Sequence, residues 1–288
     1  MAEVTAQDVA LLREKTGLGI LQCKKALTET SGDMEKAIEF LRKQGAAVAA
    51  KRSGKETKEG KVILASSVDA VAAVEINCET DFVSASDDFN AFAGKTARVI
   101  VDKKPSNVDA LKALAMDATT VEEVNTAVIA KIGENISIRR FALEKVGAGE
   151  LAETYSHMQG KIGVIVKLGF IGTPNDKPGL STLAKDLAMQ VAASMPIAIE
   201  PKDIPSALIE KEREIARELT LKEGKTGDMV EKIVEGKITR FYKENCLISQ
   251  VFIKDTKITV DKLLANTAKS QGLESVKVLG FHRLQLGQ

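Results

Sequence analysis

The sequence Glu75-Ile76-Asn77-Cys78-Glu79-Thr80-Asp81-Phe82-Val83 changes character halfway along its length. Its first residues alternate between apolar and polar side chains, a pattern that indicates a β-strand. Thr80 and Asp81 are residue types that cap the start of a helix, so a turn and a helix are predicted to follow the strand. Asp81 and Phe82 therefore place a carboxylate and a large apolar ring side by side at a strand end.

Two interpretations of this pair follow from the spacing. In the first, the turn is only a cap, and the Phe82 ring folds back into the core. In the second, the ring is a probe that fills a pocket of a partner protein, while the Asp81 carboxylate acts on charge there. Helix caps occur in most proteins, so the spacing alone favours the first interpretation.

Composition excludes several classes of function. The chain has 288 residues, with 41 Lys and Arg against 40 Asp and Glu, and the two signs are interleaved. Binding to a phosphate backbone needs clustered positive charge, so direct binding of nucleic acid is not expected. No apolar run approaches the roughly 20 residues of a membrane helix. The N-terminus also lacks a secretory signal, so a cytoplasmic protein without membrane contact is expected.

Candidate catalytic residues are few. Cys23, Cys78 and Cys246 lie far apart and lack zinc-site spacing, so buried reduced thiols and no metal are expected. The histidines are His157 and His282, and no phosphate-binding loop or hydrolase motif accompanies them. A binding protein without a cofactor is therefore favoured over an enzyme. Use of Cys78 as a nucleophile, or of His157 as a base, stays open.

The first 52 residues are predicted to be helical throughout. Thr5 and Asp8 have the spacing of a capping box, and the segments 16–19 and 31–33 break the helical pattern. Helices of about three turns each can close a small core. This predicts a three-helix domain over residues 1–54.

From residue 61 the apolar period changes to two. An antiparallel strand pair is predicted at 62–64 and 71–76, followed by helices, including a stretch around 108–132, and by a strand at 135–143. The same order recurs after residue 150, which predicts a duplicated α+β unit with domains at 55–146 and 147–288. Ion pairing at the surface or between strands is favoured for Arg139 and Arg140 over a grip on a partner.

The second copy carries an insertion at about 203–244. An apolar stripe runs through a charged helix, Gly224-Lys225-Thr226-Gly227 forms a turn, and a second stripe returns. The pattern predicts a helical hairpin with a narrow apolar seam. An interaction arm and a passive insertion are both consistent with it.

A set of motifs in this order resembles the bacterial elongation factor Ts family and covers nearly the whole chain. The motifs are Thr16-Gly17-x-Gly19 with Cys23-Lys24-Lys25-Ala26-Leu27, Asn77-Cys78-x-Thr80-Asp81-Phe82-Val83, Ile132-Gly133-Glu134-Asn135-Ile136, Tyr155-x-His157, Ile162-Gly163-Val164 and Val191-Ala192-Ala193-Ser194-x-Pro196. The resemblance implies an α+β fold with an N-terminal ubiquitin-associated-like module, two related antiparallel-sheet-plus-helix subdomains and a helical hairpin.

The same resemblance implies a guanine nucleotide exchange factor of translation, which binds the GTPase elongation factor Tu and promotes release of GDP. It implies no catalytic residue and no cofactor. In the family, the motif that matches Thr80, Asp81, Phe82 and Val83 enters the GTPase near its magnesium site. A homodimer through the core or the hairpin stays open.

Further partner contacts are also implied by the resemblance. The N-terminal module would contact the GTPase through Leu18, Gly19, Ile20, Leu21 and Lys24. Asn77, Arg139 and His157 are weaker candidates for partner contact. Many relatives have Met-Met-Asp where this chain has Ile20-Leu21-Gln22, so the apolar contact is kept and the acidic group is not.

With the resemblance, the second interpretation of Asp81 and Phe82 is favoured, and the ring is expected to face outward. Thr80 or Asp81 is still expected to cap the following helix. Two other classes of function stay open. One is an adaptor or chaperone-like protein that holds partners without changing their nucleotide state, and the other is an enzyme that uses Cys78 or His157.

Overall fold

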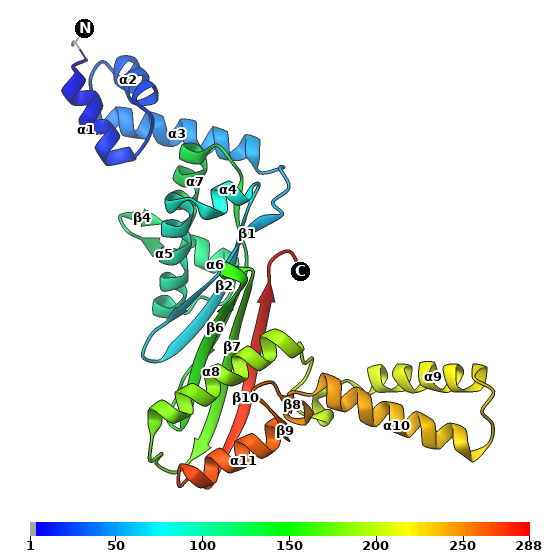
Figure 1. The fold of residues 1–288 in the computed structure, drawn as a ribbon. Coiled ribbons are helices and arrows are strands. Elements are labelled where there is room, and N and C mark those ends of the chain that lie inside the picture. The colour runs from blue at the N-terminus through cyan, green and yellow to red at the C-terminus, as the bar shows by residue number, and fades with distance from the viewer. Residues whose placement is uncertain (1–3) are drawn as a thin grey trace. The chain divides into compact units, whose positions relative to one another are not determined.

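A computed structural model describes residues 4–288 (Figure 1). The chain divides into two compact units. The first contains the residues up to Leu143 together with Met158–Ile162 and Leu284–Gln288, and the second contains Glu144–His157 and Gly163–Arg283. The domain boundaries predicted at residues 54 and 146 stay a prediction.

The first unit begins with helices that enclose a small core of their own. They are α1 (Ala6–Thr16), α2 (Ile20–Glu29) and α3 (Met34–Arg52). The predicted capping box at the start of α1 is confirmed, since Thr5 and Asp8 bond to each other's backbone N–H groups. Leu12, Cys23 and Leu27 are fully buried between the helices. The last turns of α3 pack on a later helix of the same unit, α7 (Val121–Ile132).

A sheet follows, with the strand order β1-β2-β5. Its strands are β1 (Glu59–Ser66), β2 (Ala70–Cys78) and β5 (Ile136–Lys145). The predicted antiparallel pair is confirmed, with Glu59 opposite Cys78. Every residue of β2 is buried, including the polar Glu75 and Asn77. Alternate side chains of β2, from Ala70 to Cys78, belong to the core shared with the helices, and its Glu75 carboxylate meets Arg139 and Arg140 of β5.

Helices cover one side of this sheet (Figure 1). They are α4 (Asp81–Ala85), α5 (Asp87–Lys103), α6 (Val108–Ala113) and α7. Phe89, Phe92 and Ile100 of α5 fill the core against β2. The predicted helical stretch over 108–132 is interrupted by a short antiparallel pair, β3 (Ala115–Met116) and β4 (Thr119–Thr120). Asp117 between them has a φ of 55°, which a continuous helix does not allow.

The second unit repeats the strand arrangement of the first. Its sheet has the order β10-β7-β6, formed by β6 (Glu150–His157), β7 (Ile162–Ile171) and β10 (Ser275–Gln285). In both sheets, the strand that comes second along the chain is central and the last one returns beside it. Helix α8 (Lys177–Ser194) packs on β6 and buries Leu183, Leu187 and Val191. This recurrence agrees with the predicted duplication of an α+β unit.

The insertion is the predicted helical hairpin. It consists of α9 (Ser206–Lys222) and α10 (Asp228–Asn245), with Ala216, Val234 and Ile238 buried in its seam. Three later elements were not predicted, namely β8 (Val251–Phe252), β9 (Asp255–Thr259) and α11 (Val260–Ser270). None of the helices within residues 4–288 is both long and apolar enough to span a membrane.

Candidate functional site

The turn after β2 is a helix cap, as the sequence predicts. Strand β2 ends at Cys78, and Thr80 is the N-cap of α4, where its hydroxyl accepts the N–H of Val83 at 3.4 Å. Asp81 is the first residue of the helix, and its Oδ1 accepts the N–H of Phe82 at 2.9 Å. The Asp81 carboxylate is thus oriented by the backbone while it stays exposed.

Phe82 and Val83 of α4 point in different directions. Val83 is buried in the core of the first unit, whereas 85% of Phe82 is exposed. The interpretation in which the ring folds into the core is therefore wrong, and the expectation that the ring faces outward is confirmed. A fully presented aromatic ring beside a carboxylate is a surface that gains free energy when a partner covers it.

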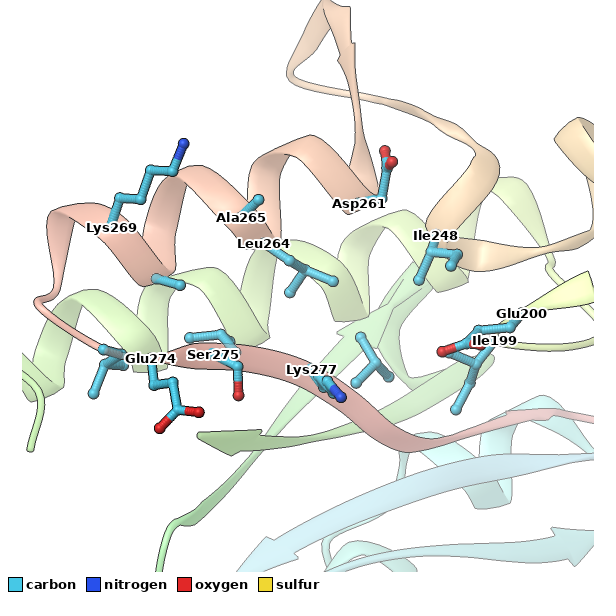
Figure 2. A pocket seen from close by; sticks show the side chains of 14 residues that line it. Ile199, Glu200, Ile248, Asp261, Leu264, Ala265, Lys269, Glu274, Ser275 and Lys277 are labelled. Carbon is cyan, nitrogen blue, oxygen red and sulfur yellow. The ribbon is translucent and has the colours of Figure 1, made fainter. Parts of the chain in front are cut away.

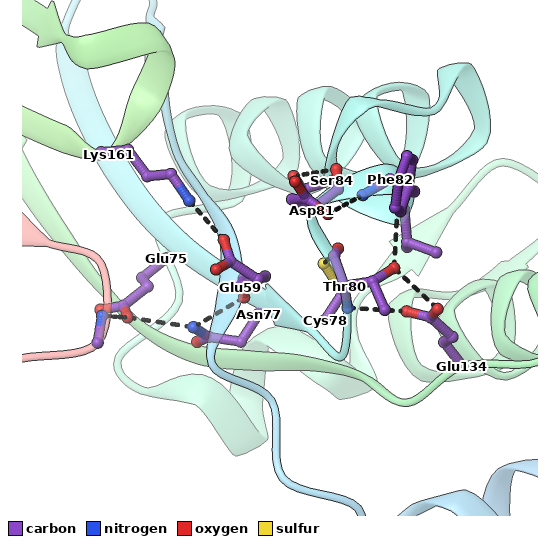
Figure 3. Close-up of polar contacts among 12 residues, drawn as sticks. Glu59, Glu75, Asn77, Cys78, Thr80, Asp81, Phe82, Ser84, Glu134 and Lys161 are labelled. Atoms are coloured by element: carbon purple, nitrogen blue, oxygen red, sulfur yellow. Dashed lines mark hydrogen bonds and ion pairs between the residues drawn. The ribbon is translucent and has the colours of Figure 1, made fainter.

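Thr80 lies between Cys78 and Glu134 (Figure 3). Its backbone N–H donates to Oε2 of Glu134 at 3.0 Å, and its hydroxyl donates to Oε1 of the same carboxylate at 2.9 Å. Glu134 belongs to the loop between α7 and β5, so it reaches the turn from another part of the unit. In the sequence Glu134 stands out only as part of a motif, since nothing local to residue 134 indicates a partner 54 residues away.

Cys78 supports the turn and is unsuited to nucleophilic catalysis. Its buried thiol donates to the carbonyl oxygen of Thr80 at 3.1 Å. Burial, and after it the negative charges of Glu134 and Glu59, raise the pKa of the Cys78 thiol from 9.0 to about 12. The reactive form of cysteine is the thiolate, which is scarce at neutral pH with such a pKa. The alternative in which Cys78 acts as a nucleophile is therefore not supported by the chemistry of its thiol.

The candidates on the N-terminal module divide into exposed and supporting residues. Ile20 and Leu21 open α2 with 55% and 82% of their surfaces exposed, and Lys24 is exposed one turn later. Leu18 is buried in the three-helix core. Gly19 is the N-cap of α2, and its N–H donates to Oε1 of Gln22 at 3.1 Å. The apolar pair on α2 and the ring on α4 therefore form two separate patches of the first unit.

Arg139 and Asn77 lie around a buried carboxylate. Glu75 is fully buried, and it contacts Arg139 at 3.1 Å and Arg140 at 2.7 Å, which confirms the predicted pairing between strands. Asn77 is also buried, and its Nδ2 donates to the carbonyl oxygen of Glu59 at 3.3 Å and to Oε1 of Glu75 at 3.4 Å. Asn77 is thus placed to support the sheet, while part of the Arg139 side chain is exposed.

His157 belongs to the second unit, at the end of β6. It is exposed, and its Nδ1 lies 3.0 Å from the hydroxyl of Tyr155. The turn that follows has positive φ angles at Met158, Gln159 and Gly160. The structure therefore places His157 on a tight turn, with a tyrosine as its polar neighbour.

A cavity lies in the second unit, between α11 and β10 (Figure 2). It has a volume of about 370 Å³ and a largely apolar lining that includes Leu264, Val276 and Val278. None of its described lining residues is a histidine or a cysteine. Within residues 4–288, no cluster of three or more His, Cys, Asp or Glu side chains is arranged to hold a metal ion.

The fold is an α+β fold with an exposed turn after β2, and comparison with known sequences gives its family. The profile described as Elongation factor TS matches residues 79–288. Proteins named Elongation factor Ts from Desulfovibrio desulfuricans and Clostridium novyi are each 44% identical over 290 residues, which is 99% of this chain and 99% and 93% of theirs. One from Prosthecochloris aestuarii is 42% identical over the full length of both chains.

These matches define the chain as a translation elongation factor. It belongs to the elongation factor Ts family.

Proposed function

We propose that this protein is a guanine nucleotide exchange factor that binds elongation factor Tu in its GDP form and promotes release of GDP. The observation that carries the proposal is the exposed Phe82 ring beside the oriented Asp81 carboxylate. Thr80 and Val83 frame this pair, the first by capping α4 and the second by anchoring it in the core. All four residues belong to the motif that the family uses at the magnesium site of the GTPase.

The energy for the exchange comes from binding. Covering the Phe82 ring in a pocket of the partner contributes roughly 2–3 kcal/mol. The complex can use that free energy to move apart elements that hold the magnesium ion and the phosphates of GDP. Asp81 adds a negative charge near a site that binds phosphate and magnesium. This charge weakens the binding of GDP further.

Coupling between the two ligands is reciprocal. If this protein lowers the affinity of the GTPase for GDP, then bound nucleotide lowers the affinity of the GTPase for this protein by the same factor. GTP that enters the emptied site therefore displaces the factor, which returns unchanged. No bond is made or broken by the factor, so it needs neither a catalytic group nor a cofactor.

A second contact is proposed at the start of α2. Ile20 and Leu21 present apolar surface there, and Lys24 supplies a positive charge one turn along. Leu18 and Gly19 hold the start of that helix in place. Direct contacts by Arg139 and His157, the cytoplasmic location and a homodimer through the core or the hairpin remain proposals as well.

The test is the release of a fluorescent GDP analogue from elongation factor Tu. Release is expected to accelerate with the concentration of this protein and then to reach a plateau. A release rate that does not change at saturating concentration would refute the proposal. Stable complex formation without faster release would instead support the adaptor alternative.

A further inference from the structure

Glu134 is placed to hold the residue that precedes the exposed pair. It follows Gly133, which ends α7 with a φ of 82°, and it lies just before β5. Both of its carboxylate oxygens accept hydrogen bonds from Thr80, one from the backbone N–H and one from the hydroxyl. Hydrogen bonds to an ionised acceptor are stronger than neutral ones, and the double contact also fixes the orientation of Thr80.

A second carboxylate makes the reverse connection. Oε1 of Glu79 accepts the backbone N–H of Asn135 at 2.7 Å. The adjacent pairs 79–80 and 134–135 therefore each supply a carboxylate to the backbone of the other. Such an exchange fixes the turn after β2 against the loop before β5 at two points.

The polar groups of Thr80 all have partners inside the protein. Besides the two donations to Glu134, its hydroxyl accepts the N–H of Val83 and its carbonyl oxygen accepts the thiol of Cys78. Helix α4 has only five residues, and a helix this short is unstable without external contacts. The position of Phe82 thus depends on how firmly Thr80 is held.

We propose that Glu134 is a positioning residue for nucleotide exchange, which holds Thr80 so that Asp81 and Phe82 are presented before the partner arrives. A turn ordered in advance avoids the entropy loss of ordering it during binding. Without the hydrogen bonds from Thr80 to Glu134, only a fraction of the molecules present the ring. The apparent affinity for the partner then falls by that fraction. This inference rests on the proposed function.

The test compares Glu134→Ala with the wild type in the GDP release assay with elongation factor Tu. The concentration of factor that gives half-maximal release is expected to rise about tenfold, while the rate at saturation changes less than twofold. Glu122→Ala is the control, because Glu122 is an exposed residue of α7, the helix before the loop that contains Glu134, and it forms an ion pair with Lys112. It is expected to change neither value. An unchanged half-maximal concentration for Glu134→Ala would overturn the proposal.

The same substitution in a Phe82→Ala background separates positioning from general stability. If Glu134 acts through the ring, removing the ring first leaves Glu134→Ala with less than a twofold effect. A full tenfold effect in that background would overturn the proposal. Should Glu134→Ala fail to fold, Glu134→Gln decides the question, since it keeps the size of the side chain and loses one acceptor.

Amide hydrogen exchange keeps this proposal distinct from the proposed function. In the free protein, Glu134→Ala is expected to raise the exchange rates of residues 80–84 at least tenfold and to leave α5 unchanged. Unchanged exchange rates at residues 80–84 would overturn the proposed role of Glu134, even if the wild type promotes release of GDP from elongation factor Tu. Conversely, a wild type that fails to release GDP would refute the proposed function, and raised exchange at these residues would still show that Glu134 holds the turn.

Discussion

Phe82 is the single residue on which the proposed exchange most depends. Phe82→Ala is expected to slow exchange, measured as the second-order rate of GDP release, by a factor of about 30 to 150, because roughly 2–3 kcal/mol of ring burial is lost. The free energy of unfolding is expected to change by about 0.5 kcal/mol or less, since the ring is exposed in the free protein. Both values are measured on the same preparation, by fluorescent GDP release and by urea titration.

Val68→Ala is the matched control for that substitution. Val68 is an apolar residue of the same unit, fully exposed in the loop between β1 and β2. It is expected to change neither the exchange rate nor the stability. A large loss of stability in Phe82→Ala would contradict the outward placement of the ring and make Phe82 a core residue.

The raised pKa of the Cys78 thiol predicts that the stability of the protein depends on pH. Its folded-state pKa is about 12, against an ordinary value of 9.0. Between these values the unfolded chain loses the thiol proton and the folded chain keeps it, so the free energy of unfolding falls as pH rises above 9. The slope from this group is at most about 1.4 kcal/mol per pH unit. Urea titrations at pH 8, 9 and 10 measure it, and Cys78→Ala should show a shallower decline above pH 9. Equal slopes of unfolding free energy against pH in the wild type and in Cys78→Ala would contradict the raised pKa of Cys78.

At the scale of elements, the hairpin of α9 and α10 has a core of its own. Val234 is fully buried in the seam with Ala216 and Ile238. Val234→Ala is expected to destabilise the hairpin by about 2 kcal/mol, because two methyl groups are removed and a cavity remains. The measurement is amide hydrogen exchange, which should become faster in both helices.

The same variant also decides between the two interpretations of the hairpin. If the hairpin is a passive insertion, GDP release by Val234→Ala changes less than twofold, as it should in the control Met229→Ala, whose side chain is exposed on the same helix. A fall in GDP release together with the faster amide exchange would instead make the hairpin an interaction arm for elongation factor Tu.

At the scale of the whole molecule, local patterns predicted the elements better than the contacts between them. The alternation before Thr80 and the capping types at Thr80 and Asp81 act within a few residues, and the structure has the strand and the cap. The burial of Glu75 depends on Arg139 and Arg140, more than 60 residues away, and alternation within the strand does not report such contacts.

Two further differences have local causes. The break in the helical stretch at Asp117 depends on a backbone conformation that apolar periodicity does not report. Helix α11 was not predicted although its sequence carries a helical signal, because Val260, Leu264 and Ala268 recur at helical spacing. The outward direction of Phe82 needed the resemblance, since spacing alone favoured the core.

The two exposed patches of the first unit are expected to act independently. Leu21 is exposed on α2, a helix anchored by Cys23 and Leu27 in the core of the three-helix module. Helix α4 is anchored by Val83 in the core behind β2, which is a separate hydrophobic cluster. Substitutions at sites that share no partners add within about 0.3–0.5 kcal/mol. In the GDP release assay, the effects of Leu21→Ala and Phe82→Ala on the logarithm of the second-order rate should therefore sum in the double variant. A coupling energy above about 1 kcal/mol between the two substitutions would mean that the partner binds both patches as one continuous surface.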